Sequence, residues 1–85
     1  MVIVMNKKII EIINEWDPVG LFPMAPQDEY FEEIIRIEEI ILRNEKITVE
    51  GLAAKINEIF TNSFGIDVYK KSVDDCIQVA KRILN

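Results

Sequence analysis

The side chains with the clearest chemical potential in this sequence are five carboxylates in a stretch without lysine or arginine. They are Asp17, Asp28, Glu29, Glu32 and Glu33. Two of them one helical turn apart, such as Asp28 and Glu32, offer the oxygen ligands that Mg²⁺ or Ca²⁺ accepts. Carboxylates at a helix start are also stabilised by the helix dipole without any ligand. Because the second explanation needs nothing bound, we predict no metal site and no cofactor.

Other catalytic side chains are scarce. The 85 residues include no histidine, which excludes imidazole bases, Ser-His and Cys-His pairs and the common zinc motifs. The single cysteine, Cys76, falls on the apolar face of a predicted helix, where a free cysteine usually packs as a small core residue. Three isolated glycines form no phosphate-binding loop. We therefore predict that the protein is not an enzyme and has no catalytic residue.

The acidic stretch also decides which partners suit the chain. The formal net charge is −5, and residues 17–33 carry all of it. No basic surface is available to offset the repulsion of phosphates, so nucleic acid is a poor partner. A protein with a basic surface suits the stretch, because complementary charge speeds encounter and selects the partner. The predicted partner-binding residues are Asp17, Asp28, Glu29, Glu32 and Glu33.

The sequence predicts a cytoplasmic protein without membrane contact. No segment approaches the roughly 20 apolar residues of a membrane span. The short apolar run at residues 2–5 precedes Lys7 and Lys8, whereas a secretory signal has its positive charge first. A lone cysteine makes no internal disulfide, which fits a reducing compartment.

Four segments that repeat apolar residues at helical spacing must position these side chains. They span about residues 4–16, 27–43, 49–62 and 72–84. Thr48 is a good N-cap for the third helix, Ser72 and Asp75 resemble a capping box for the fourth, and Gly65 suits a left-handed helix end. The predicted fold is all-α, a single domain over residues 1–85 in the form of a compact four-helix bundle.

The predicted first and second helices are joined by a loop rich in proline. It contains Pro18, Pro23, Pro26 and Gly20, together with the apolar residues Val19, Leu21, Phe22 and Met24. Such a stiff and apolar loop is expected to pack onto the bundle, with Val68 and Tyr69 of the last connection also packing inward. Glu38 falls inside the broad apolar arc of the second helix, so its burial stays open.

Two short motifs flank this loop: Trp16-Asp17-Pro18-Val19-Gly20 and Pro26-Gln27-Asp28-Glu29-Tyr30. Together they resemble a family of small bacterial proteins of unknown function, the YugE-like proteins. The resemblance implies an all-helical cytosolic protein and supplies no activity, cofactor or catalytic residue. Some proteins with similar elements resemble immunity proteins, the inhibitors of bacterial toxins.

The motifs also have a structural interpretation. Trp16 is expected to anchor the core through its ring and to donate its indole N–H to a loop carbonyl. Pro18 and Gly20 set the bend, Pro26 opens the second helix, and Tyr30 locks the loop.

Two hypotheses remain. The first is a non-catalytic protein-interaction module whose acidic residues meet a basic partner, such as a toxin that it inhibits as an immunity protein. The alternative is a helical domain that binds a small molecule or a metal in a pocket at the 17–30 loop. Self-association into a homo-oligomer is open in either case, because a chain of this length has a small core.

Overall fold

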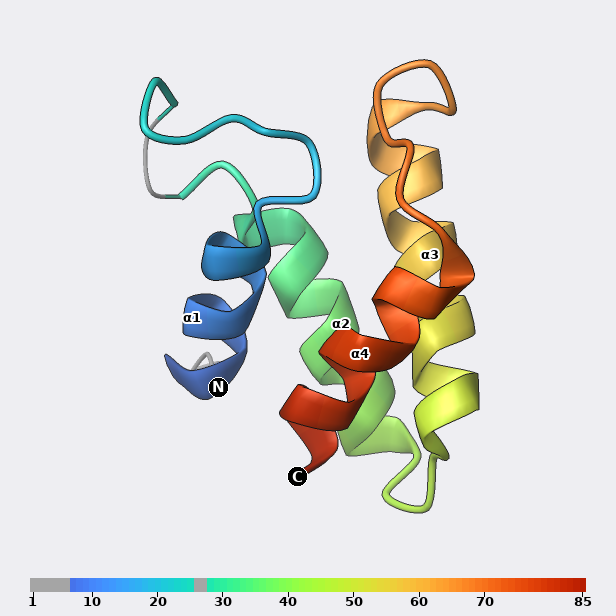
Figure 1. The fold of residues 1–85 in the computed structure, drawn as a ribbon. Helices are drawn as coiled ribbons and strands as arrows, with labels where there is room; N and C mark the ends of the chain where they lie inside the picture. The colour runs from blue at the N-terminus through green and yellow to red at the C-terminus, as the bar shows by residue number, and fades with distance from the viewer. Residues whose placement is uncertain (1–6, 26–27) are drawn as a thin grey trace.

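The protein is a ring of four helices, seen in a computed structural model that describes residues 7–25 and 28–85. The helices are α1 (Lys7–Trp16), α2 (Phe31–Arg43), α3 (Val49–Phe64) and α4 (Val73–Leu84) (Figure 1). The described ranges contain no strand. The all-α, four-helix prediction is therefore confirmed. No helix in these ranges is long and apolar enough to cross a membrane.

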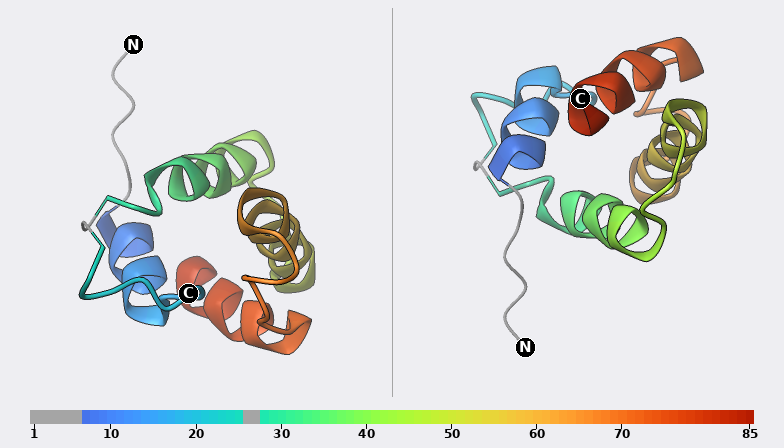
Figure 2. Two further views of the ribbon diagram at one scale, coloured as in Figure 1. Left: turned by 90° about the horizontal axis from the view of Figure 1, so that it is seen from above. Right: turned by 90° about the horizontal axis from the view of Figure 1, so that it is seen from below.

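Each helix packs against its neighbours in the chain, and α4 closes the ring by packing against α1 (Figure 2). The closure is reinforced at the surface, where the Lys8 ammonium donates to the backbone oxygen of Asn85 and Arg82 lies 3.4 Å from the Glu15 carboxylate. Helices α2 and α3 run in opposite directions, so the start of α2 and the end of α3 lie at the same end of the molecule (Figure 1). Acidic residues at the start of α2 line a surface groove together with residues 62–64 of the last turn of α3.

The interior of the ring is filled by isoleucine and aromatic side chains. The largest side chains with no exposed surface are Tyr30, Phe60, Ile13, Ile34, Ile37, Leu52, Ile56 and Cys76. Isoleucine favours strands slightly, but burial of a helical stripe outweighs a propensity difference of about half a kcal/mol per residue. Half-buried Trp16 packs edge-on against Phe60, with ring centres 5.6 Å apart. Trp16 therefore packs against the core with its ring, but its indole N–H makes none of the hydrogen bonds found among the described residues.

The predicted helix ends agree with the structure at α3 and α4. The Thr48 hydroxyl accepts from the Gly51 amide at 3.0 Å, and Gly65 has φ of 82° after the last residue of α3. Ser72 and Asp75 form the reciprocal capping box, with distances of 3.2 Å from the Asp75 amide to the Ser72 hydroxyl and 3.0 Å from the Ser72 amide to the Asp75 carboxylate. The hydrogen bonds from Ser72 hold the pKa of Asp75 below its usual value.

Removing the cap of α4 gives a first test of this architecture. Ser72→Ala is expected to lower the free energy of unfolding by about 1 kcal/mol, because the amide of Asp75 loses its acceptor. In a domain of this size the melting temperature should fall by about 5 °C. Circular dichroism during heating measures the change. Ser63→Ala removes a hydroxyl from the last turn of α3 and should cost less than half as much; equal losses would contradict the capping role.

The start of α2 differs from the prediction. Residues 28–30 form a turn in which the Phe31 amide donates to the Asp28 carbonyl at 3.1 Å, and the helix begins at Phe31. Tyr30, with φ of −99° and ψ of 13°, leaves helical geometry because its ring enters the core. The expectation that Asp28 and Glu29 lie in the first helical turn is therefore wrong. Residues 4–6 of the predicted first helix and Pro26 lie outside the described residues.

Two loop residues are more exposed than expected. Val68 is 51% exposed because Tyr69, its neighbour in the connection from α3 to α4, turns inward instead. Met24 is 93% exposed, whereas Val19, Leu21 and Phe22 pack against the core. The proline-rich loop therefore packs onto the bundle through its first half.

Candidate functional site

Asp17 organises the loop between α1 and α2. It follows the last residue of α1 with φ of 45°, a left-handed conformation that aspartate tolerates better than most residues. Its carboxylate accepts hydrogen bonds from the amides of Leu21 at 2.8 Å and Phe22 at 3.1 Å. The Tyr30 hydroxyl donates to the same carboxylate at 2.6 Å. Asp17 is thus committed to bonds within its own loop and does not belong to an exposed acidic surface.

Tyr30 is the second half of this network. Its side chain is fully buried, and its hydroxyl accepts from the Val19 amide at 3.2 Å while donating to Asp17. Burial and the bond to Asp17 raise the pKa of Tyr30. Partial desolvation acts to raise the pKa of Asp17, but the hydrogen bonds from Tyr30 and the loop amides together outweigh it and lower that pKa.

The remaining residues of the two motifs also have structural positions. Pro18 is buried, and Gly20, with φ of 72°, donates its amide to the Asp17 carbonyl at 3.0 Å. Asp17, Val19, Gly20 and Tyr30 therefore form one hydrogen-bonded corner, and Trp16 and Pro18 contribute by packing. The other described motif residues, Asp28 and Glu29, have exposed side chains.

The exposed part of the acidic stretch surrounds an aromatic ring. Asp28, Glu29 and Glu32 are exposed, and Phe31 between them is 43% exposed. We call these four residues the acidic face. Across the described part of the chain, the ion pairs are Lys55–Glu58 and Glu15–Arg82, so none involves this face. Glu33, the fifth predicted residue, is only 5% exposed and lies behind the face.

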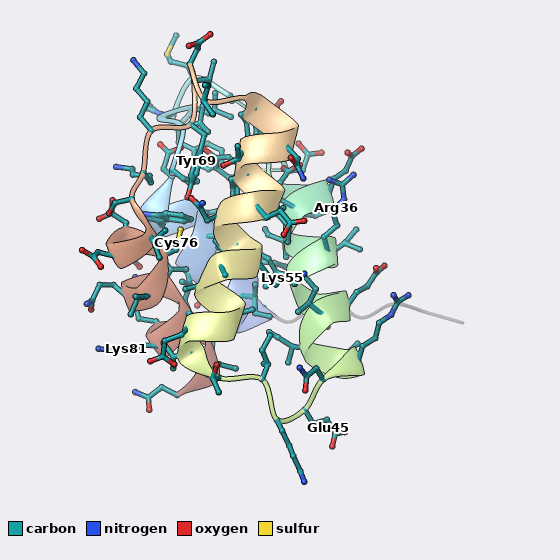
Figure 3. The ribbon with its side chains drawn as sticks, turned by 90° about the vertical axis from the view of Figure 1, so that its right-hand side faces the viewer. Arg36, Glu45, Lys55, Tyr69, Cys76 and Lys81 are labelled. Atoms are coloured by element: carbon teal, nitrogen blue, oxygen red, sulfur yellow. The ribbon has the colours of Figure 1, made fainter. Side chains whose placement is uncertain are left out.

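Arg36 does not neutralise these carboxylates. The spacing predicts a Glu32–Arg36 pair one turn apart. In the structure, Nη1 of Arg36 instead donates to the Ser63 hydroxyl of α3 at 3.5 Å. Figure 3 shows Arg36 on α2 beside the upper part of α3. The acidic face therefore keeps its charge.

Two surface grooves meet at the acidic face, and each has a volume of about 610 Å³. The first, which we call the α2–α3 groove, is lined by residues 28–29, 31–33, Arg36 and 62–64. The second is lined on the α1 side by Ile10, Glu11, Asn14 and Glu15. Asp28 and Phe31 border both grooves. Residues 17–25 line neither groove. In that segment, the side chains of Asp17 and Phe22 contact Tyr30.

The interior also contains two groups with chemical potential, the Tyr69 hydroxyl and the Cys76 thiol. The two groups share a buried hydrogen bond of 3.0 Å. Burial is the main cause that raises the pKa of both groups, so the thiol stays protonated at neutral pH.

Among the described residues, no group of three or more aspartate, glutamate or cysteine side chains is placed to hold a metal ion. Glu38 is half-buried.

Phe31, Arg36 and Ser63 are the site residues that sequence reasoning missed. The acidic neighbours of Phe31 give no signal of its exposure, because Tyr30 stands between the same four acidic residues and is fully buried. Arg36 and Ser63 are 27 positions apart, and no local pattern joins them.

Comparison with known proteins gives one match. A family model described as "Domain of unknown function (DUF1871)" matches residues 8–85. No curated protein and no solved structure matches the chain.

Proposed function

Because the chain belongs to this family of domains of unknown function, DUF1871, we propose its function from its own surface. The protein is a non-catalytic interaction module that binds a basic protein through the acidic face. The observation that carries the proposal is the exposure of Asp28, Glu29 and Glu32, without ion pairs to described residues, around a partly exposed phenylalanine.

Both parts of this surface have a role in binding. The carboxylates steer a basic partner and select it against acidic ones. Aromatic side chains that become fully desolvated in a complex contribute much of its binding energy, with polar residues around them. Phe31 has this arrangement, since acidic side chains surround it and a groove lies on each side.

The finer proposal concerns the identity of the partner. A basic toxin, inhibited by this protein as its immunity protein in the cytoplasm, fits both the charge of the acidic face and the observation that some proteins with elements similar to the two loop motifs resemble immunity proteins. The location of the gene directly after a toxin-like reading frame would strengthen this assignment.

Reversing two charges on the acidic face tests the general proposal. The double variant Glu29→Lys/Glu32→Lys is expected to weaken binding to a basic partner by roughly a hundredfold, because attraction becomes repulsion at the contact. The tagged protein is cross-linked in a lysate of its source cells, the captured partner is identified by mass spectrometry, and its affinity is then measured with purified components by calorimetry.

The matched control is Glu45→Lys/Glu50→Lys. It makes the same change in net charge at the opposite end of the molecule, where Glu45 lies in Figure 3. This variant should keep its partner. Equal capture by both variants, or an acidic partner, would refute the proposed role of the acidic face.

A further inference from the structure

We infer that the α2–α3 groove receives an arginine side chain of the basic partner, with Glu33 as its carboxylate acceptor. This inference rests on the proposed function and adds a specific recognition chemistry to it. Three features of the groove carry the inference: a largely buried carboxylate whose oxygens reach the groove, two aromatic walls, and a rim of negative charge.

Glu33 is the first feature. It lines the groove and is 5% exposed, yet its carboxylate makes no hydrogen bond or ion pair with any residue that the structure describes. Among the described residues, the carboxylate oxygens of Glu33 do not belong to the fully buried polar atoms that lack a partner, so they reach the solvent of the groove. The nearest base along the helix, Arg36, bonds to Ser63 instead. The groove thus contains an acceptor with both oxygens available to a cation that enters from outside.

The aromatic walls are the second feature. Phe31 is partly exposed on the α2 side, and half-buried Phe64 borders the groove on the α3 side. Phe64 is held in place by Phe60, stacked at 6.1 Å, and by Tyr30, edge-on at 6.0 Å. A guanidinium stacks on aromatic faces and is more weakly hydrated than an ammonium, so these walls favour arginine over lysine.

The rim is the third feature. Asp28, Glu29 and Glu32 border the groove at the surface and attract a cation toward it. The last residues of α3, 62–64, also line it, and no backbone amide in the described chain donates to their carbonyl oxygens. The end of a helix with free carbonyls carries partial negative charge. The carboxylates and carbonyls favour a cation and outnumber the one positive charge that lines the groove, Arg36, which donates to Ser63. A planar guanidinium can bond both oxygens of a carboxylate at once.

A labelled peptide of alternating glycine and arginine tests the inference with the intact chain. Its binding is followed by fluorescence anisotropy, and the bound site is mapped from the amide shifts of residues 31–36 and 62–64. Glu33→Gln keeps the side-chain shape and removes the charge, so it should weaken binding by about tenfold or more. Glu45→Gln makes the same charge change at the far end and should weaken it less than about twofold. Phe31→Ala, a change at an exposed ring, should also weaken binding and serves as the second variant.

Each contrary result has a definite meaning. Equal effects of Glu33→Gln and Glu45→Gln would show that net charge alone attracts the peptide, and would overturn the inference. A lysine peptide that binds as tightly would overturn the choice of guanidinium, and free arginine that binds as tightly would make the groove a small-molecule site. If Glu33→Gln has no effect while Glu29→Lys/Glu32→Lys abolishes partner capture, only the groove inference fails. If Glu33→Gln weakens peptide binding while Glu29→Lys/Glu32→Lys leaves partner capture unchanged, the acidic face is refuted as the partner surface, and with it the claim that an arginine of that partner enters the groove; only the affinity of the groove for the peptide stands.

Discussion

Asp17→Ala is expected to lower the free energy of unfolding by about 3 kcal/mol. The substitution removes three hydrogen bonds to one carboxylate and leaves two loop amides and the Tyr30 hydroxyl without their acceptor. It also places a residue that tolerates positive φ poorly at φ of 45°. Urea unfolding followed by circular dichroism measures the loss.

Two further variants separate the contributions at this corner. Asp17→Asn keeps a residue that tolerates positive φ but replaces one acceptor oxygen with an NH2 donor, so it separates the backbone strain from the loss of the charge and of one acceptor. Tyr30→Phe removes only the hydroxyl, and in combination with Asp17→Ala it should cost less than the sum of the two single changes. Strict additivity, or a wild-type urea midpoint for Asp17→Ala, would show that the corner is not cooperative.

The same corner predicts the direction of a pH dependence. The pKa of Asp17 is lower in the folded protein than its ordinary value, so the folded state favours the charged form. The contribution of Asp17 is complete above its unfolded-state pKa of about 3.9 and is lost as the pH falls through its folded-state pKa. Wild type should therefore lose more stability than Asp17→Asn as the solution is acidified below about pH 4.

Phe60→Ala is expected to have the largest effect, about 4 kcal/mol. The Phe60 ring has no exposed surface and contacts four other rings, at centre distances of 5.6 Å to Trp16, 5.8 Å to Tyr30, 6.1 Å to Phe64 and 5.7 Å to Tyr69. Alanine leaves a cavity where α1, α3 and the two long loops meet. A chain of this length has a total stability on the order of 4–13 kcal/mol, so much of it would be lost.

The control for this change is Phe31→Ala, which removes the same atoms from a partly exposed position and should cost less than about 1 kcal/mol. Chemical unfolding monitored by the fluorescence of Trp16 gives both values. A small loss for Phe60→Ala would mean that the ring of aromatic contacts does not hold the loops to the bundle.

The helices and their caps could be predicted because their signals are local. Apolar residues at helical spacing locate all four helices, and the capping residues Thr48, Gly65 and Ser72 each act within four positions of their own. The start of α2 could not be located in this way. Acidic residues suit a turn as well as a first helical turn, and the choice depends on the bond between Tyr30 and Asp17 across 13 positions.

The candidate site could be predicted only in part. The stretch that carries the net charge is evident in the sequence, but five acidic residues give no indication of which are exposed. Asp17 is held by its own loop, and Glu33 is covered because the end of α3 lies beside it. The first outcome depends on the folding of the loop around Asp17 and Tyr30, and the second depends on the packing of α2 against α3. Residue spacing within one helix determines neither.

The closure of the ring by α1 and α4 has a consequence for the order of events during synthesis. Helix α1 leaves the ribosome first, but its partner on the closing side, α4, is translated last. Until then α2 is the one described helix that packs against α1, whose buried face carries Ile9, Ile12 and Ile13. The nascent chain should therefore expose this isoleucine stripe to chaperones until α4 has left the ribosome. Its protection from proteases on stalled ribosomes should appear only when the stall site lies beyond residue 85.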